Sequence, residues 1–147
     1  MRDKIALILQ EINEKLKTSN ELSNSLLVGD AGICLFNILY SLNFDNSDDD
    51  FIEDFISEKV QKIAESSFTS LNSTLCNGKS GVYFFFNYLN KIGLLEDDVK
   101  NILCSDEEYL ANQALQYIKI GNYDFLHGSI GICYYLLYSN YKNEKFF

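Results

Sequence analysis

Two kinds of hydrophobic stretch alternate along this chain. In the first kind, apolar residues recur every three or four positions with charged or polar residues between them, over residues 5–16, 51–64 and 109–118. This period predicts amphipathic helices. The second kind is apolar almost throughout and spans residues 33–42, 82–89 and 132–138. A helix that is apolar on every side is buried on every side, so these stretches are predicted to be inner helices.

A Gly-x-x-Gly turn precedes each predicted inner helix. Its first glycines, Gly29, Gly78 and Gly128, are 49 and 50 residues apart, and the three turns use six of the 8 glycines. The chain has no proline. Such even spacing with matched flanks indicates an internal repeat of helical hairpins. We interpret the glycines as packing residues that permit a tight turn with positive φ and the close approach of a neighbouring helix.

The repeats predict an all-α fold, a partial α/α toroid of about three helical hairpins, over roughly 1–45, 46–95 and 96–147. Each hairpin pairs an amphipathic helix with an inner helix that begins at its GxxG turn, so the inner helices start on one shared rim. We expect residues 1–147 to form a single N-terminal arc of a longer protein, or an open arc, because three hairpins cannot close a ring. A short helix is expected at 96–103 and an acidic loop at 45–54.

The composition of the chain argues against several classes of function. With 12 basic and 21 acidic residues the net charge is −9, which disfavours nucleic acid as a partner. No apolar run reaches the roughly 18 residues of a transmembrane segment, and the N-terminus does not look like a signal peptide. We therefore expect a cytoplasmic protein. Its four cysteines, Cys34, Cys76, Cys104 and Cys133, lack CxxC spacing, so reduced packing residues are expected and no zinc site within this chain.

The turns carry a resemblance to a known family. The third turn reads Tyr123-Asp124-Phe125-Leu126-His127-Gly128-Ser129-Ile130-Gly131, and the second reads Leu75-Cys76-Asn77-Gly78-Lys79-Ser80-Gly81. With their constant period, they resemble the repeat turns of the lanthionine synthetase C-like family, and the Tyr-Asp pair is the more distinctive feature. The resemblance covers the whole chain but reaches only about the first three of that family's seven hairpins.

The resemblance implies a peptide cyclase. Such enzymes add a cysteine thiol of a precursor peptide to a dehydrated serine or threonine, forming a thioether ring. It also implies zinc, which lowers the thiol pKa and is held by two cysteines and a histidine of later hairpins. This chain has no tryptophan and no Cys-His pair, so the zinc ligands are expected outside it. The implied partners are the precursor peptide and a dehydratase, and self-association through exposed toroid ends is a further expectation.

Two residues of the third turn are candidate catalytic groups. Asp124 matches the acidic residue that lies beside the zinc site in the family, where it would orient or polarise a histidine from a later hairpin, or take part directly in proton transfer. The alternative is a capping carboxylate for the following helix. His127 is the only histidine; it is either a hydrogen-bonded turn residue or a general acid or base three residues after Asp124.

Other functions remain open on the sequence alone. The chain could be a non-catalytic truncated toroid that acts as a peptide- or protein-binding module. A carbohydrate-processing α/α barrel is a weaker hypothesis. Such an enzyme needs paired catalytic carboxylates, and only Asp124 and Asp30 lie at GxxG turns.

Overall fold

The fold was analysed in a computed structural model, which describes residues 2–19, 23–44, 54, 56–66, 71–95 and 106–141. The short helix expected at 96–103 and all but the last residue of the acidic stretch 45–54 lie outside these residues.

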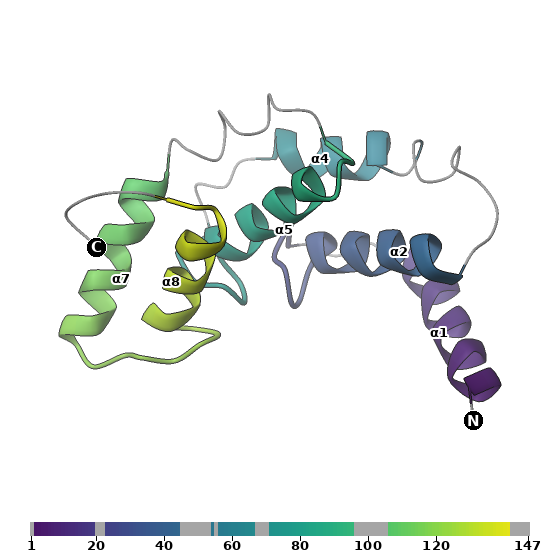
Figure 1. The fold of residues 1–147 in the computed structure, drawn as a ribbon, viewed down its shortest axis with the longest axis horizontal. Coiled ribbons are helices and arrows are strands. Elements are labelled where there is room, and N and C mark those ends of the chain that lie inside the picture. Colours follow the sequence, from purple (N-terminus) through teal and green to yellow (C-terminus); the bar gives the residue numbers. More distant parts are fainter. Residues whose placement is uncertain are drawn as a thin grey trace. The chain divides into compact units, whose positions relative to one another are not determined.

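Every regular element within the described ranges is a helix (Figure 1), which confirms the all-α prediction. The α-helices are α1 (Arg2–Lys17), α2 (Asp30–Phe44), α4 (Gln61–Glu65), α5 (Lys79–Lys91), α7 (Glu107–Lys119) and α8 (Ser129–Tyr138). A π-helix, η1 (Ile56–Val60), runs directly into α4. None of these helices is long and apolar enough to cross a bilayer. The partial toroid fits this helix content, and the toroidal arrangement of its hairpins stays a prediction.

The inner helices begin where the glycine pattern places them. Helix α2 begins at Asp30, α5 at Lys79 and α8 at Ser129, in each case at the residue after the first glycine of a GxxG turn. The chain divides into two compact units, Met1–Asn24 with Val28–Ser67 and Ser25–Leu27 with Phe68–Phe147. Each unit is described separately below.

The first unit contains α1, α2, η1 and α4. Helix α2 packs against both α1 and η1, and its buried apolar residues are Ala31, Cys34 and Ile38. The long helix predicted over 51–64 is described from residue 56 onward as η1 followed by α4. Val60 and Ile63 are its buried apolar positions, as the period predicts.

Helix α1 does not bury the apolar stripe that identified it. Ile5, Ile8 and Ile12 are exposed, whereas Asn13 is fully buried. Because a helix usually buries its apolar face, this result departs from the expected pairing of an amphipathic helix with an inner one. The sequence correctly places the helix but not the direction of its packing.

The second unit contains α5, α7 and α8. Helix α8 packs against both α5 and α7 (Figure 1), and rings from α5 and α8 meet in this core, with Tyr83 and Tyr135 centroids 6.1 Å apart and Phe84 and Tyr138 centroids 4.6 Å apart. The buried apolar side chains of these helices are Val82, Tyr83, Phe85, Phe86, Leu89, Leu110, Ala111, Ala114, Ile132, Tyr135 and Leu136.

Burial of the inner helices on every side was expected and is wrong for α8. Its residues Ile130, Tyr134 and Leu137 are exposed, although Ile132 and Tyr135 are fully buried. An apolar run therefore marks an inner helix here without covering all of its faces. Helix α5 comes closer to the expectation, with seven buried residues.

Three helices of the second unit end in the same way. Gly93 (φ +79°), Gly121 (φ +75°) and Asn140 (φ +60°) follow the ends of α5, α7 and α8 in the left-handed region. In each case the next residue donates its N–H to a carbonyl five residues earlier, as in Leu94 to Leu89 at 3.0 Å. This is the Schellman motif, which satisfies carbonyls left open at a helix end.

Candidate functional site

The three GxxG turns close with one shared hydrogen bond. In each turn the first helical residue donates its N–H to the carbonyl oxygen seven residues earlier. The pairs are Asp30 to Ser23 (2.8 Å), Lys79 to Asn72 (2.8 Å) and Ser129 to Asn122 (3.1 Å). The bond satisfies one of the N–H groups that a helix N-terminus leaves open. The repeat seen in the sequence is thus a repeat of backbone geometry.

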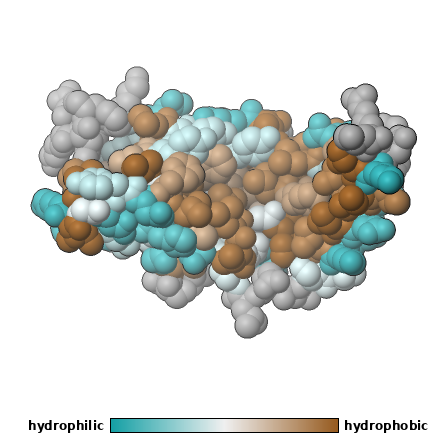
Figure 2. Space-filling view, turned by 90° about the horizontal axis from the view of Figure 1, so that it is seen from below, coloured by the Kyte–Doolittle hydropathy of each residue, from teal (hydrophilic) through white to brown (hydrophobic). Residues whose placement is uncertain are grey.

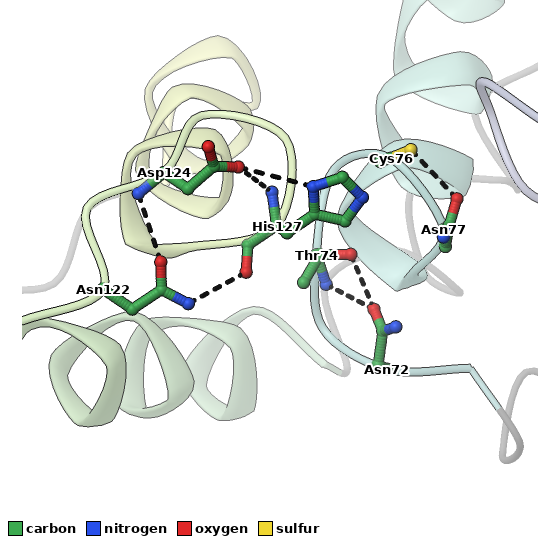
Figure 3. Close-up of polar contacts among 7 residues, drawn as sticks. All are labelled: Asn72, Thr74, Cys76, Asn77, Asn122, Asp124 and His127. Atoms are coloured by element: carbon green, nitrogen blue, oxygen red, sulfur yellow. Dashed lines mark hydrogen bonds and ion pairs between the residues drawn. The ribbon is translucent and has the colours of Figure 1, made fainter. Parts of the chain in front are cut away.

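Two asparagines organise the second and third turns, and sequence reasoning missed both. The Oδ1 atom of Asn72 accepts the N–H of Thr74 at 2.9 Å and its hydroxyl at 2.7 Å. The Oδ1 atom of Asn122 accepts the N–H of Asp124 at 3.2 Å, while its Nδ2 donates to the His127 carbonyl at 3.1 Å (Figure 3). These are Asx turns. The sequence signal that could have identified them is an asparagine six residues before the first glycine of each of these two turns.

Gly78 and Gly128 leave no space for a side chain, and the positive φ expected for these first glycines is wrong. Gly78 and Gly128 have extended backbones, with φ −126° and −139°. A Cβ on Gly128 would collide with Oδ1 of Asn122 and with the backbone of Asp124. The left-handed glycines of the described residues are Gly93 and Gly121, at helix ends.

The second glycines hold neighbouring turns together. A Cβ on Gly81 would lie 2.9 Å from Cβ of Leu26, and one on Gly131 would lie 2.9 Å from Cβ of Leu75. These two contacts are equivalent in the repeat, because each leucine stands three residues before the first glycine of its own turn. A close approach therefore occurs at these glycines, but the neighbour is the preceding turn and not the helix that was expected.

Backbone hydrogen bonds join the same turns in the same register. Leu27 donates its N–H to the Cys76 carbonyl at 3.2 Å, and Cys76 donates its N–H to the Leu126 carbonyl at 3.0 Å. All three residues stand two positions before the first glycine of their turn. The turns before α5 and α8 thus lie side by side. This is what the prediction of a shared rim requires for these two inner helices.

Asp124 and His127 lie together on the exposed side of the third turn (Figure 3). The Asp124 carboxylate accepts the backbone N–H of His127 at 2.6 Å, and its Oδ1 lies 3.5 Å from Nδ1 of the imidazole. The side chains of Asp124 and His127 are 58% and 57% exposed. The N–H donors of His127 and Leu126 and the nearby imidazole lower the pKa of Asp124. Both donors precede α8, so this carboxylate organises the turn and does not cap the helix.

The cysteines do not share a site within the described part of the chain. Cys76 is buried, and its thiol lies 2.9 Å from Oδ1 of Asn77. Cys34 is buried in the first unit, where desolvation raises its pKa to about 12. Cys133 is half-buried, and desolvation raises its pKa as well. The burial of Cys34 and Cys76 agrees with the packing role predicted for them.

The sequence analysis also did not predict an ionic cluster that joins α5 to the start of α7. The Asp106 carboxylate accepts hydrogen bonds from Nζ of Lys79 and from the Tyr83 hydroxyl, both at 2.7 Å. The Lys79 bond is the main reason that the pKa of Asp106 is lowered, while burial and the Asp106 contact raise the pKa of Tyr83. Asp106 holds the N-cap position of α7, but its side chain bonds to α5 and does not cap the helix.

Zinc, which the resemblance implies, does not fit the residues described here. No three His, Cys, Asp or Glu side chains among them come close enough to hold a metal ion. Tetrahedral zinc sites need at least three such ligands from the protein. His127 and Asp124 provide two adjacent groups at most.

Comparison with known proteins identifies the family. The model of the family described as "Lanthionine synthetase C-like protein" matches residues 20–146. No curated protein and no solved structure matches the chain. The family match covers all three GxxG turns and leaves α1 outside it. The chain therefore belongs to the lanthionine synthetase C-like family.

Proposed function

We propose that this chain is the N-terminal arc of a peptide cyclase that forms thioether rings in a ribosomal peptide. The single observation that carries the proposal is the family match over residues 20–146. In the reaction a cysteine S–H adds across the double bond of a dehydrated serine or threonine. The sulfur bonds to the β-carbon, and a proton ends on the α-carbon. The partners would be a precursor peptide and a dehydratase, in the cytoplasm.

The third turn would contribute Asp124 and His127 to this reaction. A carboxylate with a lowered pKa is ionised near neutral pH, so it suits a role that needs negative charge more than the role of proton donor. Asp124 would orient or polarise a histidine, and His127 is the one within 3.5 Å. An imidazole beside a carboxylate can then carry the proton that the α-carbon requires. Zinc would need ligands from outside the described residues, and no step is derived through it.

The alternative function is a peptide- or protein-binding module without chemistry. The observation that favours it is the exposed apolar surface beside the same turn, where Phe125, Ile130 and Tyr134 lie open to solvent. Apolar patches of this kind mark interaction surfaces. Both functions use the third hairpin, so one experiment can separate them.

A thiol-alkylation assay tests the proposal. The complete cyclase that contains this arc, supplied with zinc, is incubated with a dehydrated peptide that holds one cysteine, and free thiol is counted by maleimide labelling because cyclisation leaves the mass unchanged. We expect labelling to fall with time, and Asp124→Asn to slow this by about 100-fold, a usual loss for a group in proton transfer. Glu108→Gln, an exposed acid on α7, is the matched control and should not slow it.

Each other result has a clear meaning. Peptide binding by anisotropy without any ring formation would favour the binding module. Ring formation that Asp124→Asn leaves unchanged would remove Asp124 from the site while keeping the cyclase. Circular dichroism of each variant checks that helix content is retained.

A further inference from the structure

Three lysines line a small pocket in the first unit. The pocket lies among the end of α1, the first two turns of α2, η1 and α4. We call it the basic pocket and define it by its polar lining residues Lys17, Ser19, Asp30, Asn37, Lys59 and Lys62. Among the described residues that line it, the three lysines face a single carboxylate. Because the whole chain has a net charge of −9, the basic pocket is a local exception to an acidic protein.

A fully buried amide in this pocket points to a ligand. Asn37 of α2 is 0% exposed, and neither its Nδ2 nor its Oδ1 has a hydrogen-bond partner among the residues that the structure describes. The same holds for Oγ of Ser19, which also lines the pocket. An unsatisfied buried polar group costs free energy, and in native proteins a bound water or ion often satisfies it.

The size and the donors of the basic pocket suit a monatomic anion. The pocket holds about 10 Å³ of space, enough for about one water-sized group, so an ion of one atom fits better than a phosphate or a nucleotide. Amide, hydroxyl and ammonium groups are all donors. The Cys34 thiol in the lining adds no negative charge at neutral pH, because burial raises its pKa to about 12.

The basic pocket differs in character from much of the exposed surface. Hydrophobic side chains cover a large part of the face that Figure 2 shows. In the pocket, by contrast, six of the ten lining residues are polar or charged. An apolar patch suits a protein partner, whereas a small polar cavity suits a water or an ion.

We propose that the basic pocket binds one chloride ion, held by Asn37 together with Lys59 and Lys62. The ion would accept hydrogen bonds from Nδ2 of Asn37 while a lysine donates to Oδ1, so that both ends of the amide are satisfied. Because α1, α2 and α4 all contribute lining residues, the bound ion would stabilise their packing. The inference goes beyond the family assignment, since Lys17 and Ser19 precede the matched residues 20–146.

Chloride-dependent stability tests the proposal. Urea unfolding is followed by circular dichroism at a fixed sodium concentration, while chloride is exchanged for gluconate, a carboxylate too large for the pocket. We expect the unfolding midpoint to rise with chloride and to level off, as mass action requires for a ligand that binds the folded state alone. Screening by salt depends on ionic strength and would be equal in the two salts.

The NMR line of chloride provides a second measurement that does not depend on unfolding. The line broadens when the ion exchanges onto a large and slowly tumbling molecule. The protein should therefore broaden the chloride line in proportion to its concentration. Bromide, a monatomic anion of similar size, should compete for the pocket and narrow the line again.

Two variants and a control make the test specific. Asn37→Leu should weaken chloride binding by about tenfold or more, the factor that corresponds to a hydrogen bond with a charged group. Lys62→Gln changes an exposed residue, so it should keep the helix content and weaken binding by about threefold. Lys4→Gln, at an exposed lysine near the start of α1, is the control and should bind chloride like the parent.

Three results would overturn the proposal. Equal unfolding midpoints in chloride and gluconate, or a chloride line that the protein does not broaden, would show that the pocket holds water only. A loss of binding in Lys4→Gln equal to that in Lys62→Gln would show that chloride responds to the total charge of the protein and not to the basic pocket.

Discussion

The two units of this protein treat their buried polar groups in opposite ways. In the first unit, Asn13, Asn37 and Ser41 bury side-chain oxygen or nitrogen atoms that have no hydrogen-bond partner among the residues that the structure describes. In the second unit, the buried hydroxyls of Ser80 and Ser129 donate to the Ser73 and Asn122 carbonyls at 2.6 and 2.9 Å. Both units begin an inner helix at a GxxG turn, so the turn motif alone does not produce the difference.

The difference lies in what surrounds the turns. A buried polar atom without a partner costs about 1–3 kcal/mol, whereas a satisfied one is close to neutral or favourable. The first unit also exposes the apolar stripe of α1 while burying Asn13. Within the described residues, the first unit therefore carries the cost of three unsatisfied buried side chains, whereas the buried Ser80 and Ser129 of the second unit are satisfied.

The largest predicted effect concerns the close approach of turns in the second unit. Gly131→Val would force a side chain into the Phe125 carbonyl and the Leu75 side chain, so we expect a loss of about 3 kcal/mol or more in unfolding free energy. Gly121→Ala is the matched control, since it has open space and only a left-handed φ of +75° to strain it, at about 1 kcal/mol. Equal losses in urea titrations would contradict the close approach.

Replacing an asparagine should change the free energy of unfolding in opposite directions in the two units. Asn37→Leu replaces an unpaired buried amide by an apolar group of the same branching, so it should raise the free energy of unfolding by about 1–2 kcal/mol. Asn122→Leu removes the bonds to the Asp124 N–H and the His127 carbonyl and should lower it by about as much. If both substitutions shifted the denaturation midpoint in the same direction, the proposed difference between the two units would be wrong.

A smaller effect should follow from pH. Because Lys79 lowers the pKa of Asp106 in the folded state, the carboxylate stabilises the second unit above the unfolded pKa near 4. This contribution is lost as pH falls through the lower folded pKa. Asp106→Asn should cost about 1 kcal/mol at neutral pH and reduce the acid dependence of stability below about pH 4. An unchanged acid dependence, followed by circular dichroism, would show that Asp106 does not contribute.

The sequence predicted the features that depend on local chemistry. The inner helices begin at the residues that the three GxxG turns indicate, because the collisions that exclude a Cβ at Gly128 come from residues within the same turn. The same local pattern led to the side-by-side packing of the turns before α5 and α8. The Schellman ends at Gly93 and Gly121 were equally local, and the sequence analysis overlooked them.

Features that depend on contacts between residues far apart in the chain were not predicted from the sequence. Nothing near Asp106 in the chain indicates that its carboxylate bonds to Lys79, 27 residues away, in place of capping α7. The exposed stripe of α1 was missed for the same reason, since periodicity identifies an apolar face but not its neighbour. Asp124 was found through its turn, and its catalytic role stays a prediction.

Hydrogen exchange at two backbone amides tests the central claim, that successive turns pack in one register. The N–H groups of Leu27 and Cys76 donate to the turn that follows each of them, so both should exchange at least about 100-fold more slowly than the same amides in an unstructured peptide. Protection of both amides, lost together in Gly131→Val, is the result we expect. Exchange at the unstructured rate in the native protein would contradict the shared register.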